Sequence, residues 1–283
     1  MKIIECPRDA MQGLQEFIPT AKKAAYINQL LKVGFDTIDF GSFVSPKAIP
    51  QLRDTAEVLD QLDLSITKSK LLAIVANTRG AEMASRFDAI AYLGFPLSIS
   101  ETFQQRNTNS SITEALNAIV EIQELCKSTN KILVTYISMG FGNPYGDLYD
   151  VSVVGKFVDI LSTLEVKIIS LADTIGVSKP DQIQYLFNTL THQFPQIEFG
   201  AHLHSNPATA EEKIEAAFRA GCQRFDGALN GYGGCPMAED KLVGNLATET
   251  IVAWLKKNGN SPDLDQNAFR QALIMANLIF PKE

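Results

Sequence analysis

Residues 167–204 read KIISLADTIGVSKPDQIQYLFNTLTHQFPQIEFGAHLH. Lys167–Leu171 and Glu198–His202 are short β-rich apolar runs, and Pro180–Thr191 between them has the apolar spacing of a helix that begins at a proline. The two runs are mostly apolar at consecutive positions, which is typical of parallel strands covered on both faces. The stretch therefore predicts a strand–helix–strand unit of a parallel sheet.

The same unit repeats along the whole chain. Eight apolar runs are expected as strands: Ile3–Cys6, Thr37–Phe40, Leu71–Val75, Ala89–Leu93, Ile132–Ile137, Lys167–Leu171, Glu198–His202 and Arg224–Ala228. Helical spacing separates them, as in Thr20–Val33, Ile112–Cys126, Val151–Leu164, Pro207–Ala220 and about 246–257, with a short helix in about 77–87. Eight such units predict a closed (β/α)8 TIM barrel, with a doubly wound open sheet as the second choice.

The last segment with helical spacing follows the eighth unit. Asp265–Ile279 is expected to pack on the outside of the barrel. We therefore expect one catalytic domain over residues 1–283, with a peripheral C-terminal helical extension from about residue 260.

Composition narrows the class of protein. The 283 residues are 46% hydrophobic and carry a net charge of −7, so we expect a full core and no nucleic-acid partner. No apolar stretch approaches the roughly 18 residues of a membrane helix. The chain enters a strand at once, and its four cysteines lack disulfide-framework spacing. We therefore expect no targeting segment, no membrane partner, reduced thiols and a cytoplasmic location.

Two of the three histidines lie together at the end of an apolar run, in His202-Leu203-His204. On a strand, residues i and i+2 point to the same side, so both imidazoles project together. Imidazole is the commonest metal ligand in proteins, and a metal site is one interpretation of this pair. The other is two unrelated polar residues where a strand ends.

Polar residues also follow the other predicted strands. In a closed parallel barrel the active site lies at the carboxyl ends of the strands, so these side chains are expected to meet there. They are Arg8 and Asp9 after the first strand, Asp39 in the second, Ser100 in a long loop after the fourth, Tyr136 and Ser138 at the fifth, Asp173 and Thr174 at the sixth, and Cys235 and Asn245 after the eighth.

Asp9 and Asn245 are candidate oxygen ligands to complete a metal site. With two imidazole nitrogens they would leave two positions of an octahedral ion for substrate oxygens or water. Taken alone, each has a simpler explanation: an ion pair with Arg8 for Asp9, and a turn or helix cap for Asn245. Together with the histidines they favour a metal.

Arg8 and Cys235 are candidates for the chemistry itself. The guanidinium of Arg8 stays charged and can stabilise a developing enolate or carboxylate oxygen, although a salt bridge to Asp39 or Asp173 is equally compatible with the spacing. On a strand, Arg8 would point away from Asp9 unless the strand has ended. The thiol of Cys235, beside two glycines, could donate or accept a proton.

At this point the chain resembles the 3-hydroxy-3-methylglutaryl-CoA lyase family, within the superfamily of metal-dependent lyases and Claisen-condensing enzymes. The resemblance covers nearly the whole chain, from Ile3 to about Trp254. It is carried by Pro7-Arg8-Asp9 with Gln12, Ser42–Lys47, Asp173–Gly176, His202–His204, Gly233–Pro236 and Gly244–Glu249.

The resemblance implies an acyl-CoA thioester substrate, cleaved by a retro-Claisen reaction to acetoacetate and acetyl-CoA. It implies a divalent ion, Mg or Mn, on Asp9, His202, His204 and Asn245, with Arg8 stabilising the enolate and Cys235 handling a proton. Asp39 stands where the family has a glutamate. We expect Asp39 and Asp173 among the catalytic residues, and we expect substrate-binding roles for Gln12, Ser42, Tyr136, Ser138 and Thr174.

Several positions depart from the family pattern. Ala10 replaces a glycine, Gly13 replaces a polar residue, and Ser205-Asn206 replace the usual Asp-Thr. These departures keep three alternatives open: a related acyl-CoA lyase, an enzyme that condenses acetyl-CoA with a 2-oxo acid, and an inactive metal-binding barrel. The Cys6-Pro7 pair before Arg8 argues against the condensing enzyme. The oligomeric state, a homo-oligomer included, is left open.

Overall fold

The computed structural model describes residues 1–234 and 243–280. Eight strands form a closed barrel in which all neighbours are parallel and β8 pairs with β1. They are β1 (Lys2–Glu5), β2 (Thr37–Ser42), β3 (Lys70–Ile74), β4 (Ile90–Ser98), β5 (Ile132–Ser138), β6 (Ile168–Asp173), β7 (Glu198–Leu203) and β8 (Arg224–Gly227). The predicted barrel is confirmed, and the open sheet is excluded.

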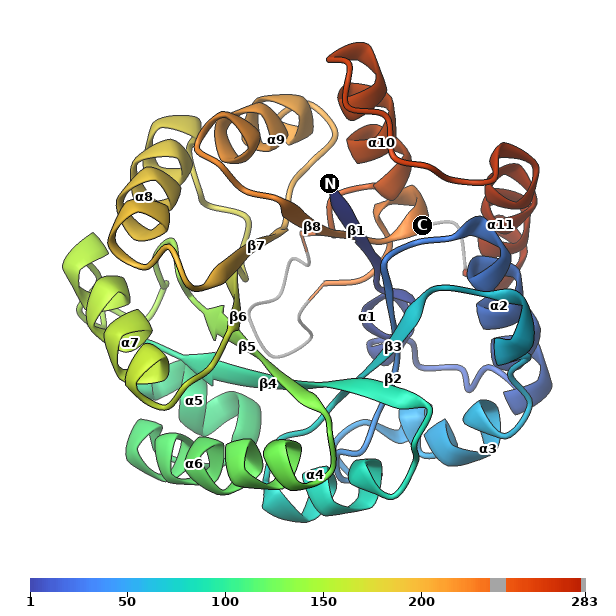
Figure 1. The fold of residues 1–283 in the computed structure, drawn as a ribbon, viewed down its shortest axis with the longest axis horizontal. Coiled ribbons are helices and arrows are strands. Elements are labelled where there is room, and N and C mark those ends of the chain that lie inside the picture. Colours follow the sequence, from blue (N-terminus) through green and yellow to red (C-terminus); the bar gives the residue numbers. More distant parts are fainter. Residues whose placement is uncertain (235–242, 281–283) are drawn as a thin grey trace.

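Most of the helices surround the barrel as an outer ring (Figure 1). The helices are α1 (Pro7–Gln12), α2 (Thr20–Val33), α3 (Thr55–Leu59), α4 (Thr78–Ser85), α5 (Glu101–Thr108), α6 (Ile112–Ser128), α7 (Val151–Thr163), α8 (Pro180–Gln193), α9 (Ala210–Arg219), α10 (Thr248–Lys257) and α11 (Gln266–Ile279). Among these described helices, none has the length and apolar character needed to cross a membrane.

The strands are buried on both faces, as their continuous apolar runs predict. β2 and β6 are buried at every position. One large apolar cluster includes residues of both the strands and the helices, and a second cluster of Leu72, Ile74, Val134, Tyr136 and Ile168 comes from β3, β5 and β6. The interior of the barrel is therefore apolar beside β3, β5 and β6. Polar side chains can occupy the interior beside β7 and β8.

The C-terminal helix α11 packs against α2 (Figure 1). The backbone N–H of Asp265 donates to the carbonyl of Val33 at 2.9 Å, and the rings of Phe35 and Phe269 meet edge to face. The contact buries the apolar face that α2 would otherwise expose at its C-terminal end.

Several predicted element boundaries are wrong: β1 ends at Glu5 instead of Cys6, and β4 runs to Ser98 instead of Leu93. Ser100 does not lie in a long loop: it caps α5, its Oγ accepting from the backbone N–H of Phe103 at 3.1 Å. The helix expected from Pro207 begins instead at Ala210. The side chain of Asn206 accepts from two backbone N–H groups of the preceding turn, at 3.0 and 3.2 Å, and thus stabilises a turn in place of the first helical residues.

Candidate active site

A cavity of about 420 Å³ opens where the strands end. The lining includes nine of the residues predicted from the sequence: Arg8, Asp9, Gln12, Ser42, Tyr136, Ser138, Thr174, His202 and His204. Phe103 and Arg106 of α5 complete part of the wall and were not predicted. Asp39, Asp173 and Asn245 lie outside this lining, and Cys235 lies outside the described residues.

The first strand ends earlier than expected, and this places Arg8 and Asp9 on the same helix. β1 ends at Glu5, and Pro7 begins α1, where its missing N–H costs nothing. Nη1 of Arg8 therefore reaches the Asp9 carboxylate at 2.9 Å instead of pointing away from it. It also donates to Oε1 of Gln12 at 2.9 Å. The helix thus gathers three predicted site residues on one side.

The rest of the Arg8 guanidinium binds Asp39. Nε and Nη2 donate to Oδ2 of Asp39 at 3.0 and 2.6 Å. A register irregularity between Asp39 and Gly41 interrupts the pairing of β2 with β3 at this point. Of the two salt bridges that the sequence left open for Arg8, the one with Asp39 forms. The ion pair with Asp9 forms as well, so Arg8 lies between two carboxylates.

The two carboxylates respond differently to burial. Burial raises the pKa of Asp39 from 3.8 to about 6, although the neighbouring Arg8 charge opposes that rise. Burial also opposes ionisation of Asp9, but the charges of Arg8 and His202 outweigh it and lower the pKa of Asp9 to about 2. Asp9 is therefore a carboxylate at every working pH, as a metal ligand must be.

His202 and His204 project together, as the strand spacing predicts, and both lie beside Asp9. One ligand atom from each of the three residues lies within 4.8 Å of the others. Both ring nitrogens of His204 are buried and, among the described residues, neither makes a hydrogen bond. Burial lowers the pKa of His204 to about 4, so its ring is neutral at pH 7 and has a lone pair to offer. An orphaned neutral imidazole beside an ionised carboxylate fits a divalent cation.

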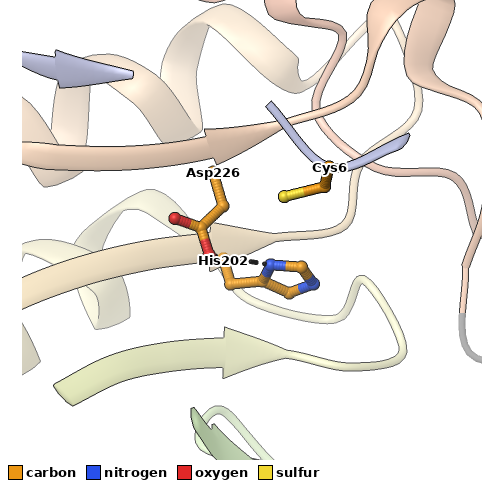
Figure 2. Close-up of side chains that lie close together, drawn as sticks. All are labelled: Cys6, His202 and Asp226. Atoms are coloured by element: carbon orange, nitrogen blue, oxygen red, sulfur yellow. Dashed lines mark hydrogen bonds and ion pairs between the residues drawn. The ribbon is translucent and has the colours of Figure 1, made fainter. Parts of the chain in front are cut away.

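The other histidine is held by a residue that the sequence analysis did not single out. Nδ1 of His202 lies 3.1 Å from Oδ2 of Asp226 on β8, and Cys6 projects into the same space (Figure 2). Burial alone would lower the pKa of His202, but the Asp226 carboxylate raises it overall. The sequence did contain a signal for Asp226, because an aspartate in the middle of the predicted strand Arg224–Ala228 would be a buried charge that needs a partner.

Asn245 reaches the site through its contact with Asp9. Its Nδ2 donates to Oδ2 of Asp9 at 2.6 Å and to the carbonyl of Tyr232 at 2.9 Å. Gly233 makes this approach possible: its φ is +96°, and a Cβ there would lie 2.7 Å from the Asp9 carbonyl and 2.8 Å from Nδ2 of Asn245.

Asp173 belongs to a separate network behind the cavity. Its carboxylate accepts from Nζ of Lys213 at 2.8 Å and from the backbone N–H groups of Val177 and Ser178 at 2.9 and 3.0 Å. These contacts hold the loop that follows β6 in place. Because the Asp173 carboxylate is bound to Lys213, the salt bridge between Asp173 and Arg8 that the sequence left open does not form. A catalytic role for Asp173 stays a prediction, as do the substrate contacts assigned to its neighbour Thr174.

Comparison with known proteins places this site in context. Residues 2–275 match the model of the family described as HMGL-like. A Bacillus subtilis protein named hydroxymethylglutaryl-CoA lyase is 34% identical over 272 residues, which cover 95% of this chain and 88% of that protein.

Solved structures agree with the sequence match. The Bacillus subtilis HMG-CoA lyase structure superposes with a TM-score of 0.92 at 31% identity, covering 100% of this chain and 95% of that one. An Acinetobacter baumannii HMG-CoA lyase, solved with coenzyme A and 3-methylmalate, gives a TM-score of 0.90 at 30% identity and covers 99% and 90% of the two chains. The likeness therefore extends over the entire barrel.

Proposed function

The chain belongs to the HMGL-like family and is a carbon–carbon lyase of the hydroxymethylglutaryl-CoA lyase type, and from this premise we propose that it cleaves 3-hydroxy-3-methylglutaryl-CoA to acetoacetate and acetyl-CoA. The observation that carries the proposal is the grouping of Asp9, His202 and His204 beside Arg8 in the wall of one cavity. A retro-Claisen cleavage needs an activated hydroxyl and a cation that stabilises the enolate. A metal ion on Asp9, His202 and His204 would activate the hydroxyl, and Arg8 is the cation for the enolate.

The donor set supports a divalent metal ion, and we assign it to Mg or Mn. Asp9, His202 and His204 would hold the ion, with Asn245 as the fourth predicted ligand beside Asp9. Mixed carboxylate, amide and imidazole donors suit such ions better than a thiolate-preferring one. When bound, the ion would polarise the C3 hydroxyl and a carboxylate oxygen of the substrate and make that hydroxyl more acidic.

Arg8 is the group we assign to the developing negative charge. Transfer of the C3 hydroxyl proton to a base lets the oxygen electrons form the keto group of acetoacetate as the C2–C3 bond breaks. The electron pair of that bond stays on the acetyl-CoA fragment as an enolate. The Arg8 side chain is fixed by Asp39, Asp9 and Gln12, so its guanidinium is oriented before substrate arrives. A preorganised cation in a largely buried site stabilises such a charge strongly.

The remaining roles are proposals of the same kind. Cys235 would supply or relay the proton that converts the enolate carbon to a methyl group. Ser42, Tyr136 and Ser138 line the cavity and would contact the acyl group, together with Gln12 and Thr174. The acyl-CoA class is supported by the coenzyme A found in the Acinetobacter baumannii relative. A cytoplasmic location stays a prediction from the sequence, and the oligomeric state stays open.

The decisive experiment is acetoacetate formation from 3-hydroxy-3-methylglutaryl-CoA by chelator-treated protein, with and without added Mg²⁺ or Mn²⁺. We expect product only when the metal is added. A His204→Ala variant is the matched control, because it removes one orphaned ligand and leaves Arg8 in place. A folded protein that binds Mn²⁺ and yields no acetoacetate would contradict the proposed substrate, and a homologous acyl-CoA would then be tested.

A further inference from the structure

The barrel interior below His202 is polar on its β8 side. Arg224 and Asp226 are two residues apart on β8 and face the same side, whereas Phe225 between them belongs to the large apolar cluster. The guanidinium of Arg224 lies 5.8 Å from the ring of Tyr92, which packs on the interior cluster. Both charged side chains therefore point into the barrel, where a charge is retained only with a partner.

Asp226 has such a partner in the metal-site histidine. Its Oδ2 lies 3.1 Å from Nδ1 of His202, and Oγ of Ser170 lies 3.4 Å from the same oxygen. Asp226 is 1% exposed, so water does not compete for this contact. The second ring nitrogen of His202 points away from Asp226 (Figure 2). A neutral imidazole carries one proton, and a proton held on Nδ1 leaves the Nε2 lone pair free.

We propose that Asp226 is a positioning residue: by accepting the Nδ1 proton it fixes the tautomer and orientation of His202, so that Nε2 is presented to the divalent ion with Asp9 and His204. This inference rests on the proposed function, because it assumes that the three residues hold a metal. A histidine ligand with its second nitrogen bound to a carboxylate is the usual arrangement at protein metal sites.

His202 and Asp226 could instead bind a metal ion themselves, together with Cys6. Cys6, His202 and Asp226 also offer three ligand atoms within 4.8 Å of one another (Figure 2). A metal held there would take Nδ1 of His202, so the two arrangements exclude each other. The observed hydrogen bond from Nδ1 to Asp226 fits the positioning role, because it leaves Nε2 for the ion beside Asp9 and His204.

The first test is Mn²⁺ affinity of the free protein, measured from the electron paramagnetic resonance signal of unbound Mn²⁺. We expect Asp226→Asn to raise the Kd about 10- to 100-fold. Cys6→Ser should leave the Kd within twofold of wild type. Asp54→Asn is the matched control for a lost buried carboxylate, because Asp54 pairs with Lys23 at 2.7 Å and does not line the cavity. It should lower the melting temperature and leave the Kd unchanged.

The second test reads the tautomer directly and needs no metal. The chain has three histidines, so a ¹⁵N-histidine spectrum is simple to assign. At alkaline pH His202 of the wild type should carry its proton on Nδ1, and D226N should shift it toward Nε2. The wild-type spectrum suffices even if D226N does not fold.

The outcomes distinguish failure of the positioning role from failure of the proposed reaction. An Nε2-protonated His202 in the wild type, an unchanged Kd in D226N, or a Kd raised equally by Cys6→Ser would overturn the positioning role. A wild type that binds Mn²⁺ with the expected tautomer but forms no acetoacetate would refute the proposed reaction and support the positioning role. A wild type that binds no Mn²⁺ would overturn both.

Discussion

Replacing Arg8 by glutamine tests whether its guanidinium acts on the substrate or only balances buried charge. Arg8 is 7% exposed and lies 2.6 Å from the Asp39 carboxylate and 2.9 Å from that of Asp9. R8Q leaves Asp39 without a cation and removes the guanidinium from beside Asp9. Breaking a buried pair in this way costs about 3–5 kcal/mol of unfolding free energy. Loss of the charge that stabilises the enolate should separately lower turnover about 100- to 1000-fold.

The stability loss should depend on pH because Asp39 can take up a proton. Its folded-state pKa is about 6, above the ordinary 3.8, so its contribution to stability is complete below 3.8 and is lost as the pH rises through 6. Without the Arg8 charge the pKa of Asp39 rises further, so the stability of R8Q keeps falling to a higher pH than that of the wild type. The difference in unfolding free energy between wild type and R8Q should therefore widen above about pH 6.

The assay is acetoacetate formation at saturating substrate and metal, with urea unfolding of each variant from pH 5 to 8. Lys23→Met is the matched control. It strands the buried carboxylate of Asp54, which Lys23 contacts at 2.7 Å, and neither residue lines the cavity. K23M should lose comparable stability and keep turnover within a few-fold of wild type. A folded R8Q with near-normal turnover, or a K23M as inactive as R8Q, would refute the assigned role of Arg8.

Three further predictions follow from buried or tightly packed groups. Burial raises the pKa of Glu5 from 4.5 to about 8, so Glu5 should contribute a fall in wild-type stability of about 1.4 kcal/mol per pH unit between those values. Glu5→Gln should remove that contribution in urea unfolding, and parallel pH profiles of the two proteins would contradict it. Gly233→Ala should weaken Mn²⁺ binding at least tenfold because of its contacts with Asp9 and Asn245, whereas Gly259→Ala, with φ +75° and open space, should leave Mn²⁺ binding unchanged. Lys213→Met should cost about 3–5 kcal/mol in thermal or urea unfolding, and adding Asp173→Asn should restore part of it if their 2.8 Å ion pair is the cause.

The barrel was predictable because its signal is local and repeated. Each strand is an apolar run of a few residues and each main helix shows its own periodicity, so eight units can be counted without knowing how they pack. The histidine pair was predictable for the same reason, since strand alternation places His202 and His204 on one side. The boundaries that failed, at Glu5, Ser100 and Pro207, depend on capping and turn contacts that apolar periodicity does not report.

The barrel, the end of it where the site is predicted, and the residues expected there could all be inferred from the amino-acid order alone. Their pairing could be read only from the folded chain: Arg8 with Asp39 and Asp9, Asp173 with Lys213, and His202 with Asp226. Apart from Arg8 and Asp9, which are neighbours on α1, the partners come from different strands and helices and lie 24 to 40 residues apart in the chain. Closure of the barrel brings them together, and the low-dielectric interior then makes the pairing decisive.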